Sequence, residues 1–270
     1  MAKPGPVYYL PHGGGPLPLM GDPNHAGMVA LHRGLAERVA GCPAVVVVTA
    51  HWEAAHTSFS GAERPAMLFD YYGFPPETYT YRYPAPGAPE LAKRAGSLLA
   101  AAGLESEIDG SRGYDHGTFV PMMLIRSEAD VQILQMSLLS SLDPAAQIAV
   151  GRALALLLAE GVAIVGSGMS FHNLGALLGG RRIPEGADRD FDSWLDAALT
   201  DPDLGEDERA DRLAHWQDAP GARAFHPREE HLLPLHACFG AASAAGYSAE
   251  NIFREPLMGY MTSGYAWNVA

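Results

Sequence analysis

Short, largely apolar runs recur along the chain and predict buried strands at residues 7–10, 45–49, 131–137 and 162–165. The second run contains four consecutive valines. Continuous hydrophobicity of this kind is typical of a central strand that helices cover on both faces. Between and after these runs, apolar residues recur at helical spacing and predict helices at residues 25–40, 90–102, 144–160, 189–199 and 230–245. This alternation predicts an α/β fold in which a central mixed or mostly parallel β-sheet is flanked by helices.

The length of 270 residues fits one large domain, and we expect residues 1–270 to form it, with two smaller domains as the alternative. No internal repeat or low-complexity stretch divides the sequence. Residues 69–87 are rich in Tyr, Pro and Gly, a composition that rules out a long regular element. We therefore expect an ordered loop there, with its aromatic side chains packed against the domain.

Composition and charge exclude several classes of partner. The formal net charge is −13, so no basic surface is available to neutralise the phosphates of a nucleic acid. No apolar run is long enough to span a bilayer, and the first residues lack the apolar core of a signal peptide. Cys42 and Cys238 cannot form a disulfide scaffold and are expected to be free thiols. We expect a cytoplasmic protein, a monomer or small homo-oligomer, with no membrane or nucleic-acid partner.

Three of the eleven histidines stand at the ends of apolar segments. His12 follows the first predicted strand and precedes three glycines, His51 follows the valine-rich run, and His231 precedes Leu232 and Leu233. Imidazole is the commonest protein ligand of catalytic transition metals. Ligands that come from distant parts of a chain and stand on rigid elements suggest a catalytic metal site. The alternative, for each histidine taken alone, is an ordinary hydrogen-bonded residue of the core or surface.

Other histidines have less distinctive settings. His226 and His236 flank His231, and their roles stay open: on a helix His236 would not share a face with His231, and His226 precedes a proline. The remaining histidines outside the motifs receive no role: His25, His32, His56 and His215.

Six motifs cover nearly the whole chain: PHGGGP at 11–16, TAHWE at 49–53, DYYGFP at 70–75, YDHG at 114–117, GSG at 166–168 with HNL at 172–174, and HP at 226–227 with EH at 230–231 and GAA at 240–242. In this order they resemble the class III extradiol ring-cleaving dioxygenases. The resemblance is to the DOPA 4,5-dioxygenase-like branch of the superfamily that contains the protocatechuate 4,5-dioxygenase catalytic subunit. It implies metal-dependent cleavage of a catechol-type aromatic diol by dioxygen.

The resemblance also assigns roles to individual residues. It implies metal ligation by His12, His51 and His231, and acid–base or oxygen-handling roles for His172 and His116. His172 follows a Gly-Ser-Gly turn at the end of a predicted strand and is the first choice for the acid–base role. Asp115, next to His116, is a candidate to orient it.

Substrate contacts and metal identity are less tightly specified. The glycine turn and the aromatic residues near the motifs make Gly14, Trp52 and Tyr72 candidates for substrate binding. The protocatechuate branch has a glutamate where this chain has His231, with Glu230 directly before it. Fe(II) is the cofactor expected for activity, and Zn(II) is possible because three neutral imidazoles also suit zinc.

Two other functions remain open at this stage. A zinc-dependent hydrolase would use the same metal site to activate water, with Glu53 or Glu230 as the base. A non-catalytic binding protein of the same fold is the second alternative. Which catechol is the substrate cannot be deduced from the sequence, because the shape of the pocket determines it.

Overall fold

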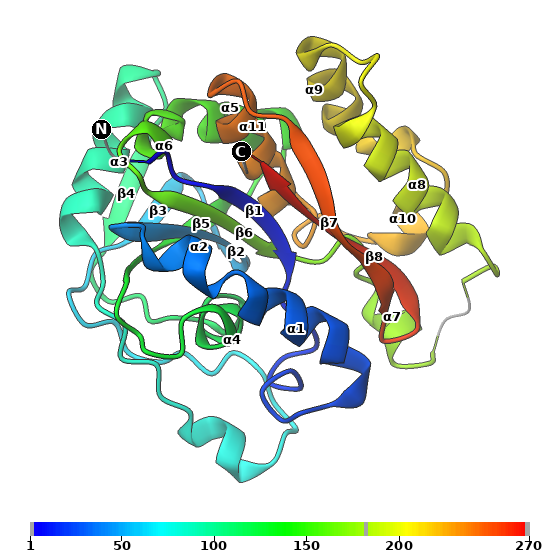
Figure 1. Cartoon of the computed structure of the whole chain (residues 1–270), viewed down its shortest axis with the longest axis horizontal. Helices are drawn as coiled ribbons and strands as arrows, with labels where there is room; N and C mark the ends of the chain where they lie inside the picture. The colour runs from blue at the N-terminus through cyan, green and yellow to red at the C-terminus, as the bar shows by residue number, and fades with distance from the viewer. Residues whose placement is uncertain (1–2, 181–182, 268–270) are drawn as a thin grey trace.

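A computed structural model of the chain describes residues 3–180 and 183–267. Its centre is one eight-stranded sheet in the order β4-β3-β5-β2-β6-β1-β8-β7 (Figure 1). The α/β fold with a mostly parallel central sheet flanked by helices is confirmed. The strands are β1 Val7–Pro11, β2 Ala44–Ala54, β3 Thr57–Ser60, β4 Ser106–Asp109, β5 Gln132–Leu139, β6 Ala163–Gly168, β7 Ala249–Leu257 and β8 Tyr260–Trp267.

The four inner strands β5, β2, β6 and β1 run parallel, so their carboxyl ends lie at one edge of the sheet. Gly166 of β6 pairs with Tyr9 of β1 on one side and Val48 of β2 on the other. Antiparallel pairing extends the sheet through β8 and β7 at one end and through β3 at the other. The sequence did not predict β3, β4, β7 and β8, because they are short or carry polar residues at many positions.

The inner strands are buried on both faces, as their continuous hydrophobicity predicted. Along β2, Val46 and Val48 join a core with α3, α5 and α11, whereas Val45 and Val47 join a second core with α2 and α4. In Figure 1, α1, α2 and α4 cover one face of the sheet and α3, α5 and α11 the other. The helices are α1 Ala26–Gly34, α2 Ala36–Ala40, α3 Pro89–Ala101, α4 His116–Ile125, α5 Pro144–Leu154, α6 Leu156–Ala159, α7 Leu174–Leu177, α8 Ala187–Thr200, α9 Glu206–Ala214, α10 Ala222–Phe225 and α11 Leu233–Ala244.

Three predicted helices have different bounds in the structure. The helix expected at 25–40 is divided at Leu35 into α1 and α2, and the one expected at 144–160 is divided at Ala155 into α5 and α6. The helix expected at 230–245 begins at Leu233, with Pro234 in its first turn, where a missing N–H costs nothing. His231 therefore stands in the turn before α11 and not on the helix.

The expected loop at residues 69–87 is ordered and contains a short 3-10 helix, η2, at Pro76–Thr80. The Tyr71 hydroxyl donates a hydrogen bond of 2.6 Å to the Thr78 carbonyl and closes the loop on itself. Two further 3-10 helices are η1 Pro23–His25 and η3 Trp216–Asp218. Across residues 3–180 and 183–267, no helix is long and apolar enough to cross a bilayer.

The buried His32 of α1 should make stability depend on pH. Its Nδ1 donates to the Met28 carbonyl at 2.7 Å, its Nε2 has no protein partner, and burial lowers its pKa to about 4. Between about pH 4 and the ordinary histidine pKa near 6.5, the unfolded chain therefore binds a proton that the folded chain does not. This contribution to stability is complete above pH 6.5 and is lost as the pH falls toward 4.

The unfolding free energy of the wild type should fall as the pH is lowered from 6.5 to 4. We predict that His32→Leu makes this slope smaller by up to about 1.4 kcal/mol per pH unit, the value for one proton. Urea unfolding at a series of pH values measures the slope. Ala30→Ser, at an exposed position of the same helix that carries no titratable group, is the control and should leave the slope unchanged. An unchanged slope in His32→Leu would show that His32 does not stay neutral in the folded protein.

Candidate metal centre

Two of the histidines stand at the carboxyl ends of neighbouring inner strands. His12 directly follows β1, and its backbone N–H donates to the Gly168 carbonyl at the end of β6. His51 lies in β2 between Val48 and Glu53, where the pairing of β2 with β5 shifts register. Such irregularities change the direction in which side chains point. The parallel sheet and this shift together bring two residues that are 39 positions apart into contact.

The turn that carries His231 is fastened to the end of β6. The His231 carbonyl accepts hydrogen bonds of 2.9 Å from the Met169 N–H and of 2.9 Å from the Tyr9 hydroxyl. A Cβ atom at Gly168 would stand 2.2 Å from that carbonyl, so only glycine lets the turn approach this closely. The glycines of β6 therefore fix where the imidazole of His231 lies.

The rings of His12, His51 and His231 form a nearly equal-sided triangle. The distances between ring centres are 4.9 Å for His12 and His51, 5.1 Å for His12 and His231, and 4.9 Å for His51 and His231. Imidazoles that bind one metal at about 2.0–2.1 Å in a tetrahedral arrangement have ring centres about 5 Å apart. The Nε2 atoms of His12 and His51 face each other at 3.1 Å. By ring spacing the three side chains are a candidate ligand set, whereas the ligand atoms that lie within 4.8 Å of one another group His12 and His51 with His116, and His231 with His172 and Glu230.

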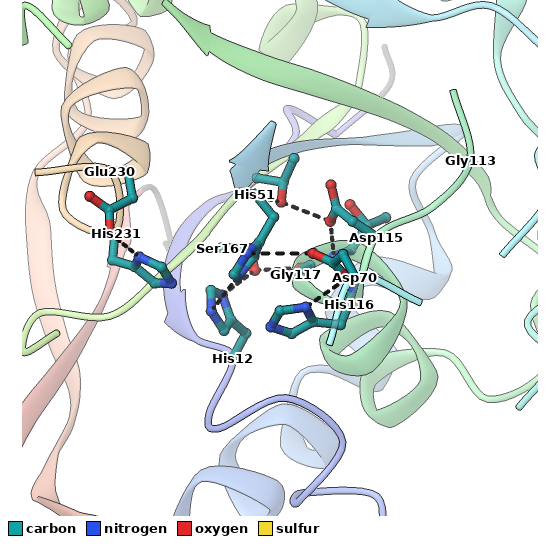
Figure 2. Close-up of polar contacts among 12 residues, drawn as sticks. His12, His51, Asp70, Gly113, Asp115, His116, Gly117, Ser167, Glu230 and His231 are labelled. Atoms are coloured by element: carbon teal, nitrogen blue, oxygen red, sulfur yellow. Dashed lines mark hydrogen bonds and ion pairs between the residues drawn. The ribbon is translucent and has the colours of Figure 1, made fainter. Parts of the chain in front are cut away.

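His116 is an alternative third ligand. One ring nitrogen from each of His12, His51 and His116 lies within 4.8 Å of the others, so this trio could also hold a metal. Figure 2 shows His12 and His51 between His231 on one side and His116 on the other. The ring of His116 is 3.9 Å from that of His51 and 5.5 Å from that of His12, a less regular triangle.

In three of these rings, Nδ1 lies at hydrogen-bond distance from a side-chain oxygen atom. His12 Nδ1 lies 3.0 Å from the Ser167 hydroxyl, which donates its own proton to the Gly117 carbonyl. The hydroxyl must then accept from His12, which places the proton on Nδ1 and leaves Nε2 with a free lone pair. Carboxylates take the same position behind His231 and His116, where Glu230 Oε1 and Asp70 Oδ1 lie 3.0 and 2.8 Å from Nδ1.

His172 lies against His231. It stands four residues beyond β6, and its backbone N–H donates to the Phe225 carbonyl. Its ring stacks on that of His231 with centres 3.3 Å apart and planes inclined by 15°. Its Nδ1 lies 3.3 Å from the same Glu230 oxygen that holds His231. His172 therefore faces the cavity beside the proposed ligands.

Burial keeps the metal-site histidines neutral. Burial is the largest influence on each: it takes the pKa of His12 and of His51 well below the usual value, and that of His231 to about 3. The neighbouring imidazoles lower the pKa of each further. Since a histidine must be neutral to bind a metal, these three need not release a proton near neutral pH.

The two carboxylates remain ionised for a different reason. Burial alone would raise the pKa of Glu230, but the hydrogen bonds from His172 and His231 outweigh it and hold the pKa well below its usual range. Burial likewise opposes ionisation of Asp70, and the hydrogen bonds from His116 lower its pKa overall. Each carboxylate is therefore a charged acceptor on the Nδ1 side of the imidazoles beside it.

The histidines open onto a cavity of about 820 Å³ whose lining is mainly apolar. Gly14 and Tyr72 line it, and Tyr72 is 91% exposed at its rim. Among the lining residues that the structure describes, Arg228 is the one Lys or Arg side chain, and it pairs with Glu53 and lies 3.5 Å from Glu230. The apolar part of the lining consists of Leu17, Ala50, Tyr71, Tyr72, Phe74, Met169, Leu174, Leu177, Leu178 and Met258.

Trp52 lies outside this lining, unlike the other candidate ligand, acid–base and substrate-binding residues, namely His12, His51, His231, His172, His116, Gly14 and Tyr72. Successive residues of a strand point to opposite faces, so Trp52 faces away from the cavity that His51 faces. It is buried, with the Arg112 guanidinium 4.9 Å from its ring centre, and it lines a separate surface depression.

The prediction that Asp115 orients His116 is wrong. Asp115 caps α4 by accepting from the Thr118 N–H, and it accepts a second hydrogen bond from the Thr49 hydroxyl. Its carboxylate points away from the ring of His116, which Asp70 holds instead. Sequence reasoning missed the roles of Asp70 and Ser167, although both belong to motifs that supported the resemblance.

His226 and His236 have structural partners. Both are fully buried. His226 Nε2 lies 2.9 Å from the Ser170 carbonyl, and His236 Nε2 and Nδ1 lie 2.8 and 3.2 Å from the carbonyls of Leu213 and Leu232. Neither lines the cavity.

Residues 6–267 match the family described as the catalytic LigB subunit of aromatic ring-opening dioxygenase. The chain belongs to this family. It is 45% identical over 261 residues to dioxygenase tasH of Hapsidospora irregularis, covering 88% of this chain and 78% of that protein. It is 39% identical over 206 residues to a 4,5-DOPA dioxygenase extradiol of Beta vulgaris, covering 74% and 73%. The crystal structure of the uncharacterized protein JW3007 from Escherichia coli K12 superposes with a TM-score of 0.76 at 28% identity, covering 97% and 98%.

Membership of the LigB family confirms the resemblance drawn from the six motifs, and with it an enzyme of the extradiol dioxygenase class. The hydrolase and the non-catalytic binding protein are not favoured by these relatives. The LigB family is metal-dependent, and the histidine cluster supplies side chains that could bind the metal.

Ser167 should strengthen metal binding through His12. We predict that Ser167→Ala raises the dissociation constant for Zn(II) about 10–100-fold, because His12 Nδ1 loses the acceptor that fixes its orientation and tautomer. Chelator competition measures the constant. Ser137→Ala is the matched control: this buried β5 serine accepts a hydrogen bond from the Ser58 N–H but contacts no histidine. Equal affinity in Ser167→Ala and wild type would contradict the role given to Ser167.

Proposed function

We propose that this enzyme opens the ring of a catechol-type substrate with dioxygen at a metal held by His12, His51 and His231. The observation that supports this proposal most directly is the triangle of neutral imidazoles lining a largely apolar cavity. Three protein ligands on one side of a metal leave positions free for substrate and dioxygen. Fe(II) is the proposed active metal, with Zn(II) able to bind at the same site.

His231 is proposed as the third ligand in preference to His116. The ring of His231 is equally distant from His12 and His51, whereas that of His116 crowds His51. His116 then remains available for proton transfer or for polarising the substrate. Its Nδ1 donates to Asp70, so its Nε2 is the nitrogen free to accept a proton.

Proton transfer is assigned to His172 first. A catechol must lose a proton to bind through both oxygens, and an acid must later protonate the departing oxygen as the ring opens. Held by His12, His51 and His231, a ferrous ion would supply Lewis acidity toward the catechol oxygens and a path for electrons from the catechol to dioxygen. His172 faces the cavity, and the ionised Glu230 stands behind its Nδ1, where it would stabilise the imidazolium formed when Nε2 takes a proton.

The cavity suits a flat aromatic ring with a polar substituent. Tyr71, Phe74 and Met258 provide apolar contacts, and Gly14 lets the substrate approach the backbone. Tyr72 at the rim is proposed to cover the substrate. Relatives named 4,5-DOPA dioxygenase make DOPA the first catechol to test.

Oxygen uptake tests the proposal directly. We expect the metal-free protein, reconstituted anaerobically with Fe(II), to consume oxygen with DOPA or a simpler catechol and to form a yellow ring-opened product. The Zn(II)-loaded protein should bind its metal but consume no oxygen, because Zn(II) has no accessible redox chemistry. Failure of the Fe(II) protein to consume oxygen with any catechol of a broad panel would refute the proposal.

The stacked pair His231 and His172 should separate metal binding from proton transfer. His231→Ala should lose most of the bound metal, since two ligands make a much poorer site than three. His172→Ala should keep near-normal metal content while turnover falls by on the order of a hundredfold or more, the scale of a lost acid–base group. Metal analysis and oxygen uptake on the same samples measure both quantities.

His116→Ala serves as the comparison. Metal retained in His231→Ala but lost in His116→Ala would make His116 the third ligand. Metal lost from His172→Ala would make His172 a ligand, and normal turnover in that variant would return it to a packing role.

A further inference from the structure

Glu230 is shared between a proposed metal ligand and the proposed acid–base residue. Its Oε1 lies 3.0 Å from His231 Nδ1 and 3.3 Å from His172 Nδ1, so one oxygen meets the same edge of both stacked rings. Its Oε2 is buried, 3.5 Å from the Arg228 guanidinium. The carboxylate is thus held from behind by a cation and faces two imidazoles in front.

Asp70 occupies the corresponding position on the other side of the site. Its Oδ1 accepts from His116 Nδ1 at 2.8 Å and from the His116 backbone N–H at 2.9 Å. Its Oδ2 faces His51 Nδ1 at 3.5 Å, and the rings of His51 and His116 are 3.9 Å apart. Again one carboxylate meets the Nδ1 edges of one proposed ligand and one proposed proton-transfer residue. Figure 2 shows the two carboxylates on opposite sides of His12.

The acceptor behind His12 differs in chemistry. His12 has no proton-transfer histidine sharing its partner, and that partner is the neutral Ser167 hydroxyl. A hydroxyl can donate or accept, so Ser167 fixes the tautomer of His12 only because the Gly117 carbonyl takes its proton. An ionised carboxylate can only accept, so it requires a proton on each Nδ1 that it meets.

We propose that Asp70 and Glu230 are positioning residues. Glu230 fixes His172 and His231, and Asp70 fixes His116, in the Nδ1–H form with Nε2 toward the cavity. His51 lies 3.1 Å from His12 Nε2 through its own Nε2, so it takes the Nδ1–H form facing Asp70 once a metal occupies Nε2. The names metal ligand and proton-transfer residue rest on the proposed function. The tautomers do not depend on it and can be measured in the metal-free protein. This arrangement ties the orientation of each acid–base histidine to that of a ligand, because both rings follow the same carboxylate.

A different role for Glu230 gives the opposite tautomers. Single ligand atoms of Glu230, His172 and His231 lie within 4.8 Å of one another, so this trio could hold a metal of its own. In that case the Nδ1 atoms would carry lone pairs for the metal, and the protons would be on Nε2. The protonated ring nitrogen of His172 and His231 therefore decides between a positioning and a ligating carboxylate.

Nitrogen-15 NMR of histidine-labelled, metal-free wild type at about pH 8, above the ordinary histidine pKa, measures the tautomers directly. Signals are assigned from single His→Gln variants. We expect the Nδ1–H form at His116, His172 and His231, whereas His51 should donate from Nε2 to His12 and change to the Nδ1–H form when Zn(II) is added. An Nε2–H form at any of the first three overturns the assignment for its carboxylate, and this result needs no carboxylate variant to fold.

Carboxylate variants then test whether the pairing is specific. Glu230→Leu should give mixed tautomers at His172 and His231 and leave His116 unchanged, and Asp70→Ala should do the reverse. Each should raise the Zn(II) dissociation constant about 10–100-fold, because each releases one ligand. Glu230→Gln, which keeps an acceptor oxygen, should restore most of the Nδ1–H form.

Glu53→Leu is the matched control, since Glu53 lines the same cavity and pairs with Arg228 without contacting a histidine in the described part of the chain. Its tautomers and Zn(II) affinity should match wild type. Equal disturbance of His116, His172 and His231 by either variant, or of none of them, would overturn the proposal. If the tautomers are as expected but the protein consumes no oxygen with any catechol, the proposed function is refuted and this inference still stands.

Discussion

A buried imidazole can bind a metal only if it is neutral and its other nitrogen has a partner, and the organisation of this protein follows from that requirement. His12, His51 and His231 lie in surroundings that favour the neutral form. Each then needs an acceptor behind its Nδ1 edge. The acceptors come from β6, from the loop after β3 and from the turn before α11. The site is therefore assembled from segments that must first be fixed in space.

The parallel sheet provides that fixed frame. Register places the ends of β1, β6 and β2 side by side, so His12, Ser167 and His51 follow directly from strand pairing. The position of His231 requires one more condition, namely a strand end with no side chain beneath the turn. Gly168 supplies it, since any larger residue would collide with the His231 carbonyl. Packing at a glycine thus has a direct consequence for the geometry of the histidines.

The sequence predicted the framework better than the details. Continuous apolar runs identified the inner strands because burial on both faces leaves a strong pattern, whereas β7 and β8 mix polar and apolar residues and were missed. The five histidines of the cavity were all found, through motifs and a family resemblance. Their partners were not: Asp115 adjoins His116 in sequence, but α4 turns it toward Thr49, and Asp70 reaches His116 from 46 positions away. Such contacts depend on loop conformation, which local patterns do not encode.

Charge explains why the acceptors differ. In the proposed centre three neutral ligands leave the positive charge of a divalent ion uncompensated, and two carboxylates stand one imidazole away from it. Asp70 and Glu230 can each balance part of that charge or stabilise an imidazolium on His116 or His172. A third carboxylate behind His12 would add negative charge where an anionic catechol must also bind. A hydroxyl in that position orients His12 without adding charge, and Ser167 provides it. Asp70 and Glu230, by contrast, each face one proposed ligand and one proposed proton-transfer histidine.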